Sequence, residues 1–243
     1  MKYGEPIFFP QRGLHNSRAD RRRRRYHHFA RSCVFHESIM IHPLVRTHPL
    51  NSDQVSVREV SIILTQLEAL IRQGQRGSVV EFGCFSGTTS LYIRRLLDQY
   101  AGDVPFHVYD SFAGLPEKTT QDMSVAGDQF RAGELCATKK QFLHNFHKAG
   151  LVPPTVHKAW FRELTTDDVP GGIMLAFLDG DYYESIRDSL RVITSKLLPG
   201  AVIIVDDYAN EALPGAARAV DEWIRDRGVV LRVEASLAII TGL

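Results

Sequence analysis

The sequence predicts an α/β fold: a seven-stranded, mostly parallel sheet, with the last strand antiparallel and helices on both faces. Uninterrupted apolar strands alternate with helical segments, which is typical of a parallel sheet covered on both faces. The turn 234–236 between the last two strands is too short for a parallel crossover, so these strands pair antiparallel if adjacent. At 243 residues the chain suffices for one such domain and is short for two.

The elements are expected in a regular order after residue 50. A helix capped by Asn51 or Ser52 carries apolar residues at helical spacing from Val57 to Ile71 and ends at Gly74. Strands are expected at 78–82, 106–109, 155–157, 173–178, 201–205, 229–233 and 237–240, and further helices at 88–99, 138–149 (capped by Thr138), 183–196 and 215–227.

Residues 1–50 are expected to form an N-terminal arm, and residues 51–243 the α/β domain. The arm carries five consecutive arginines, 21–25, and little periodicity. The formal net charge of +1 is nearly balanced, so neither a nucleic acid nor a membrane is an expected partner. The start lacks a signal pattern and no apolar run approaches membrane-spanning length, so a cytoplasmic protein is expected.

A glycine-containing loop follows the first strand. It reads GxxxG from Gly83 to Gly87, and not the GxGxxG that cradles a dinucleotide pyrophosphate, which argues against NAD. The acidic Glu81 enters this loop and suits a cationic or zwitterionic ligand better than a phosphate. Its glycines let the backbone pass close to a ligand. The candidate cofactor-binding residues here are Glu81, Gly83, Cys84, Ser86, Gly87 and Thr88.

Carboxylates stand at the ends of three further strands. Asp110 ends the second strand, where a carboxylate can accept both hydroxyls of a ribose. Asp179 and Asp181 follow one buried strand, and Asp206 and Asp207 follow the next. Parallel strands bring these ends together at one edge, where the charges repel and raise one another's pKa. A hard divalent cation such as Mg²⁺ relieves that repulsion, and it can lower the pKa of an alcohol nucleophile.

Four motifs resemble one enzyme family. They are EFGCFSG (81–87), YDSFAGLP (109–116), LDGDYYES (178–185) and VDDY (205–208), the last followed by LPGA (213–216). They are similar to the macrocin, mycinamicin and novobiocin O-methyltransferases, which methylate sugar hydroxyls of antibiotic natural products. The resemblance covers about residues 45–243, and its DSFxGLP and DGDxYES strings are more specific than the glycine loop.

The resemblance implies a class I methyltransferase (Rossmann-like) fold and a set of site residues. It implies S-adenosylmethionine on the Gly83 loop and on Asp110 with Ser111. It implies that Trp160 lies near the adenine. It also implies that the segment containing Thr47 helps to hold the methionine carboxylate. Mg²⁺ is implied on Asp179, Asp206 and Asp207, with either Asp179 or Asp181 as the general base.

The resulting hypothesis is an S-adenosylmethionine- and Mg²⁺-dependent O-methyltransferase for a hydroxyl of a sugar or other small-molecule acceptor in natural-product, such as antibiotic, or glycan biosynthesis. One alternative is a catechol or phenol O-methyltransferase. Another is a non-catalytic nucleotide- or RNA-binding module on the same fold, with Arg21–Arg25 as its contact. The sequence leaves open the acceptor and its methylated position, the role of the arginines, and whether the chain forms a homo-oligomer.

Overall fold

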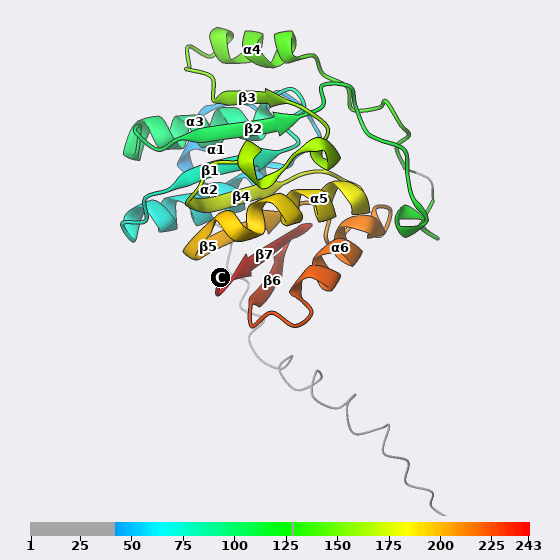
Figure 1. The fold of residues 1–243 in the computed structure, drawn as a ribbon. Helices are drawn as coiled ribbons and strands as arrows, with labels where there is room; N and C mark the ends of the chain where they lie inside the picture. Colours follow the sequence, from blue (N-terminus) through cyan, green and yellow to red (C-terminus); the bar gives the residue numbers. More distant parts are fainter. Residues whose placement is uncertain (1–41, 128) are drawn as a thin grey trace, which may run out of the picture. The chain divides into compact units, whose positions relative to one another are not determined.

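A seven-stranded sheet forms the centre of the structure (Figure 1). The structure is a computed structural model that describes residues 42–127 and 129–243, so the arginine run lies outside the described residues. The strand order is β3-β2-β1-β4-β5-β7-β6, and only β7 runs against its neighbours, which confirms the predicted sheet. The strands are β1 (Ser78–Phe82), β2 (Phe106–Asp110), β3 (Thr155–Lys158), β4 (Ile173–Leu178), β5 (Leu197–Val205), β6 (Val230–Glu234) and β7 (Leu237–Thr241).

Helices cover both faces of this sheet because successive strand residues point to opposite sides. Val79 and Val108 pack into one core with the helices that precede and follow β1, whereas Val80 and Tyr109 pack into a second core with the last two helices (Figure 1). The first core takes α1 (Pro43–Thr47), α2 (Val57–Arg72), α3 (Thr88–Tyr100) and α4 (Lys139–Lys148), and the second takes α5 (Tyr183–Ile193) and α6 (Pro214–Ile224).

The boundaries of α2, α5 and α6 differ most from the sequence expectation. Helix α2 is capped by Ser56 and not by Asn51 or Ser52, because Ser56 and Glu59 form a reciprocal capping box. Helix α5 ends at Ile193, and a single 3-10 turn, η5 (Thr194–Lys196), completes the segment. Helix α6 begins at Pro214, a residue that favours the first helical turn, and ends three residues early.

Strand β5 begins four residues earlier than expected. Pro199 and Gly200 look like a turn in the sequence, but they lie exposed within the strand. The register against β4 shifts between Ile173 and Leu175, which accommodates them as an irregularity. None of the described helices is long and apolar enough to cross a membrane.

The longest connection runs from β2 to α4 and includes the 3-10 turn η2 (Thr120–Asp122). Its residues Leu115, Phe130 and Leu135 pack with Tyr182 and Leu213 in a small third core. Two further 3-10 turns, η3 (Phe161–Glu163) and η4 (Thr166–Asp168), connect β3 to β4. These loops stand at the carboxyl ends of the parallel strands, where α/β folds bind their ligands.

Candidate active site

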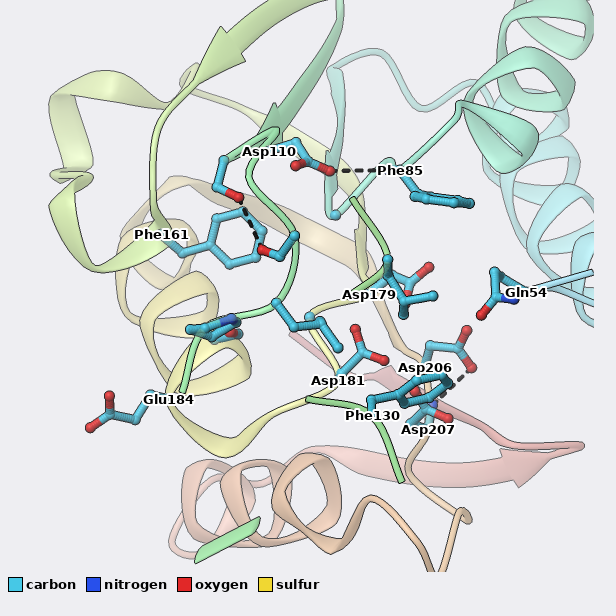
Figure 2. Close-up of a pocket in the computed structure, with 18 of the residues that line it drawn as sticks. Gln54, Phe85, Asp110, Phe130, Phe161, Asp179, Asp181, Glu184, Asp206 and Asp207 are labelled. Atoms are coloured by element: carbon cyan, nitrogen blue, oxygen red, sulfur yellow. Dashed lines mark hydrogen bonds between the residues drawn. The ribbon is translucent and has the colours of Figure 1, made fainter. Parts of the chain in front are cut away.

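A cavity of about 500 Å³ opens at the carboxyl ends of β1, β2, β4 and β5 (Figure 2). It contains eight of the residues named from the sequence: Gly83, Asp110, Ser111, Trp160, Asp179, Asp181, Asp206 and Asp207. Its other walls include residues of the motifs quoted from the sequence, together with the neighbour of Trp160: Phe85, Gly114, Leu115, Pro116, Gly180, Glu184, Ser185 and Phe161. The sequence did not indicate the remaining wall residues, which are Asp53, Gln54, Gln129, Phe130, Leu135, Arg162, Asp188 and Asn210.

The register of three strands explains how the loop and the aspartates meet. Phe82, Leu178 and Val205 are paired neighbours at the ends of β1, β4 and β5. The ladder continues one residue further, because the Asp179 N–H donates to the Phe82 carbonyl at 2.8 Å and the Asp206 N–H donates to the Leu178 carbonyl at 2.9 Å. Residues that follow these strands are therefore brought side by side.

Gly83 is required by the protein's own backbone. Its φ is +87°, and a Cβ there would stand 1.8 Å from the Asp179 carbonyl oxygen. Gly87, at φ +90°, would bring a Cβ to 3.0 Å from the Phe142 ring. The sequence argument had these glycines make room for a ligand. The structure adds a second reason for them, because they let the loop pack against Asp179, which follows β4, and against Phe142 of α4.

Gly83→Ala is expected to destabilise the fold much more than Gly74→Ala. Both glycines have left-handed φ values, +87° and +80°, so both substitutions carry a strain of about 1–2 kcal/mol. Nothing lies within 4 Å of a Cβ at Gly74, whereas Gly83→Ala must also displace the Asp179 backbone. Thermal unfolding of the two variants measures the difference. Equal losses of stability would show that the Gly83 contact does not constrain the loop.

Asp110 binds the glycine loop through its carboxylate (Figure 2). Oδ2 accepts the N–H groups of Cys84 and Phe85 at 2.9 and 3.0 Å, and Oδ1 accepts that of Phe112 at 2.7 Å. Asp110 therefore orders the loop as well as lining the cavity. Since each carboxylate oxygen has two lone pairs, these bonds leave acceptor capacity for a ligand.

Five predicted cofactor-loop residues and Thr47 do not line the cavity. Glu81 is buried and accepts the Ser90 hydroxyl at 2.5 Å, and burial raises its pKa to about 8. Cys84 is a buried packing residue whose thiol pKa is raised by burial. The Ser86 hydroxyl is buried and lacks a hydrogen-bond partner among the described residues. Gly87 and Thr88 begin α3, and Thr47 is exposed in α1.

An aromatic wall closes the β3 side. Trp160 and Phe161 both line the cavity, and the Arg162 guanidinium lies 5.1 Å from the centre of the Trp160 ring. Phe161 meets Phe82 edge-on, with the ring centres 5.4 Å apart. Such packing holds Phe161 in place and presents flat apolar surface to the cavity.

The four aspartates share one poorly solvated space (Figure 2). Burial, followed by the neighbouring carboxylates, raises the pKa values of Asp179 and Asp181 well above the usual range and that of Asp206 to about 7. Burial also raises the pKa of Asp207. The group therefore favours anything that supplies positive charge, whether a proton or a cation. Across the described residues, however, no three His, Cys, Asp or Glu side chains stand as a ready-made metal site.

Backbone strain is concentrated at this cavity. Phe85, Asp181 and Asp207 all line it, and their φ values are +44°, +57° and +56°. Left-handed backbone is costly for residues other than glycine, so it persists where the surroundings impose it, often at functional sites. Here it directs two aspartates of neighbouring strands into one cavity.

Asp181 does not cap helix α5, because another carboxylate occupies that position. The helix is preceded by Tyr182, whose side chain makes no cap. Asp122, from η2, accepts the Tyr183 N–H at 2.7 Å through Oδ1, and the Thr119 N–H and hydroxyl, each at 2.8 Å, through Oδ2. A Cβ at Gly215 would lie 1.9 Å from Asp122 Oδ1, which explains the glycine of the LPGA segment.

Asp122→Ala is expected to lower the free energy of unfolding by about 1–2 kcal/mol, because it leaves a half-buried helix N–H without its acceptor. Asp168→Ala is the matched control. The Asp168 carboxylate makes the same two contacts with Thr165, at 2.8 and 2.7 Å, but it is exposed. Chemical denaturation of both variants tests this, and an equal effect would mean that the bond to Tyr183 contributes nothing.

A profile of the macrocin O-methyltransferase (TylF) family matches residues 55–236. The tetracenomycin derivative 4'-O-methyltransferase of Streptomyces olivaceus is 32% identical over 60% of this chain and 58% of that protein. The mycinamicin III 3''-O-methyltransferase of Micromonospora griseorubida is 30% identical over 66% of this chain and 65% of that protein. The chain thus spans less than two thirds of the length of both relatives.

Solved structures of O-methyltransferases share the fold of this chain. The O-methyltransferase NovP superimposes with a TM-score of 0.68 at 25% identity, covering 77% of this chain and 80% of that chain. The calicheamicin methyltransferase CalS11 shares the fold, with a TM-score of 0.64 at 20% identity, covering 82% and 88%. The fold is therefore the class I methyltransferase (Rossmann-like) fold, and the chain belongs to the macrocin O-methyltransferase family.

Proposed function

We propose that this protein transfers a methyl group from S-adenosylmethionine to a hydroxyl of a sugar on a small-molecule glycoside, with Mg²⁺ as a required cation, in natural-product biosynthesis. The observation that carries the proposal is that one cavity is lined both by Asp110 with its neighbour Ser111 and by the four aspartates that follow β4 and β5. The family and the sugar O-methyltransferases among the relatives support this reaction class.

The cofactor side suits S-adenosylmethionine. Asp110 and Ser111 offer oxygen acceptors for ribose hydroxyls, and Trp160 and Phe161 offer aromatic surface for adenine. The Ser86 hydroxyl is buried and does not line the cavity, so its proposed role is to support the glycine loop. The nearby carboxylates favour a sulfonium cation. For Glu81, Cys84, Gly87, Thr88 and Thr47 the proposed role is to shape and support this side.

The aspartates suit a hard cation by their chemistry, since Mg²⁺ prefers carboxylate oxygen. Asp179, Asp206 and Asp207 would hold it, at the ends of the adjacent strands β4 and β5. When bound, Mg²⁺ would lower the pKa of the acceptor hydroxyl and stabilise the developing alkoxide by several kcal/mol. The raised pKa values of these carboxyls support this assignment, because a bound cation would offset the repulsion between them.

Asp181 is the proposed general base. Asp122 frees it from capping α5, its left-handed backbone turns it into the cavity, and burial with the neighbouring carboxylates raises its pKa, which makes the ionised carboxylate a stronger proton acceptor. The loop between β2 and α4 contributes Leu115, Phe130 and Leu135, which cover the acceptor side and exclude water. Methyl transfer also requires the acceptor oxygen to lie in line with the methyl group of the cofactor. The cavity walls would hold the acceptor in that position.

Ligand binding and an acceptor screen test the proposal. Calorimetry should show that S-adenosylhomocysteine binds and NAD does not, and Asp110→Ala should weaken that binding at least tenfold. A screen of glycosides and catechols with labelled S-adenosylmethionine should then give label on glycoside hydroxyls. Preferential binding of NAD would refute the cofactor assignment, and labelling of catechols alone would refute the sugar acceptor.

A further inference from the structure

A serine hydroxyl joins Asp206 to a glutamate of helix α2. Ser236 lies in the turn between β6 and β7, and its Oγ is 2.8 Å from Asp206 Oδ1 and 2.5 Å from Glu59 Oε1. The backbone of this turn is anchored too, because the Ser236 carbonyl accepts the Ala209 N–H at 3.0 Å. Three segments that are distant in the sequence therefore converge behind one aspartate of the cavity.

Glu59 is a rigid anchor for this contact. Its other oxygen, Oε2, accepts the Ser56 N–H at 2.8 Å, and the Ser56 hydroxyl accepts the Glu59 N–H, which completes the capping box of α2. The helix is 16 residues long and buries Val60, Ile63 and Leu64 in the first core. A carboxylate fixed at both oxygens on such a helix has little freedom to follow Ser236 if the turn moves.

Among the described residues, the side-chain contacts of Asp206 fall on one of its two oxygens. Oδ1 contacts Ser236 Oγ and also accepts the Asp207 N–H at 2.8 Å, and these two contacts constrain the orientation of the carboxylate. Asp206 lines the main cavity and also a second hollow that Glu59 and Ser236 line. The contacts made behind Asp206 thus decide how its carboxylate is presented in the main cavity.

We propose that Ser236 and Glu59 are positioning residues that hold the Asp206 carboxylate in the orientation that binds the cation. This inference rests on the proposed function. Helix capping alone needs only the Ser56–Glu59 pair, and the one hydroxyl proton of Ser236 must be shared between the two carboxylates. Two carboxylates on one hydroxyl repel each other, so the arrangement does not favour folding by itself. A cation bound to Asp206 in the cavity would offset this repulsion. Partners behind a metal ligand typically change metal affinity or activity by about 10–100-fold.

Calorimetric titration of Mg²⁺ into protein saturated with S-adenosylhomocysteine tests the role. Ser236→Ala should raise the Kd for Mg²⁺ about tenfold, and Glu59→Gln, which keeps the helix cap, should also raise it. Ser236→Thr retains a hydroxyl and should restore binding. The Kd for S-adenosylhomocysteine should stay unchanged in all three. Ser90→Ala is the matched control, since it removes a 2.5 Å serine–glutamate bond at the cofactor loop and should leave the Kd for Mg²⁺ unchanged.

The outcomes separate this inference from the proposed function. If wild type binds Mg²⁺ and Ser236→Ala binds it equally well, the positioning role is refuted and the metal assignment stands. An equal loss in Ser90→Ala, or no recovery in Ser236→Thr, would also refute the role. If wild type takes up no Mg²⁺, both the role and the metal part of the proposed function are wrong.

Discussion

Asp206→Asn is expected to reduce methyl transfer about a thousandfold and, at the same time, to stabilise the metal-free protein. The loss corresponds to about 4 kcal/mol of transition-state stabilisation, which is within the several kcal/mol that a divalent cation supplies to a developing alkoxide. The gain in stability arises because the substitution removes one charge from a buried group of four carboxylates.

The pH dependence of this gain follows from the raised pKa of Asp206. Burial, Asp207 and Glu59 raise it from 3.8 to about 7 in the folded state. A raised pKa means that the folded state binds the proton more tightly, so this contribution to stability is complete below about pH 4 and is lost as the pH rises through about 7. The variant escapes the loss, and its Tm at pH 8 should exceed that of wild type by about 2–4 °C.

Thermal unfolding in chelator at pH 5 and pH 8, together with a methyl-transfer assay in Mg²⁺, checks both expectations. Asp103→Asn is the control, because it removes a negative charge from an exposed position outside the cavity. It should change neither activity nor the pH dependence of Tm. Full activity of Asp206→Asn, or a lower Tm at pH 8, would contradict the cation assignment.

Asp181→Asn is expected to lower kcat by about a hundred- to ten-thousandfold while the Kd values for Mg²⁺ and S-adenosylhomocysteine change little. A general base acts in the transition state, so its loss appears in kcat and not in ground-state binding. Asp179→Asn should behave differently, because a cation ligand lost from the end of β4 weakens Mg²⁺ binding as well. The comparison decides between two aspartates that the sequence could not separate.

Measurement of kcat, KM and the Kd for Mg²⁺ in both variants checks this assignment. The neighbouring Ser185→Ala, which also alters the cavity wall, controls for a general disturbance of the β4–α5 turn. If Asp179→Asn lowers kcat without affecting Mg²⁺ binding and Asp181→Asn remains active, then Asp179 is the base and our assignment is reversed.

The parallel core of the sheet was predictable because its strands are buried on both faces. The bounds expected for β1 and β4 agree with those observed, since each is a short, mostly apolar segment that is followed by a glycine or a polar residue. The ends of β5 and α5 were harder to predict. Pro199 and Gly200 signal a turn locally, but pairing with β4 keeps them in the strand. At these two residues the tertiary contacts outweigh the local turn propensity.

The carboxylates of the site were predictable because they follow strands directly, and the strand register then places them together. Phe130 and Leu135 of the cavity wall were not predictable, because they lie in a long connection without periodicity. Asp122 and Ser236 were missed for a related reason. Each forms a hydrogen bond with a residue at least 30 positions away in the chain, and no local sequence pattern predicts such a contact.

The central claim is that one cavity unites S-adenosylmethionine, a divalent cation and a sugar hydroxyl. The most direct measurement is transfer of labelled methyl from S-adenosylmethionine to a glycoside acceptor, in chelator and after Mg²⁺ is restored. We predict transfer to a hydroxyl with Mg²⁺, at least a hundredfold less in chelator, and full recovery on adding Mg²⁺ back. Transfer that proceeds equally well in chelator would contradict the account.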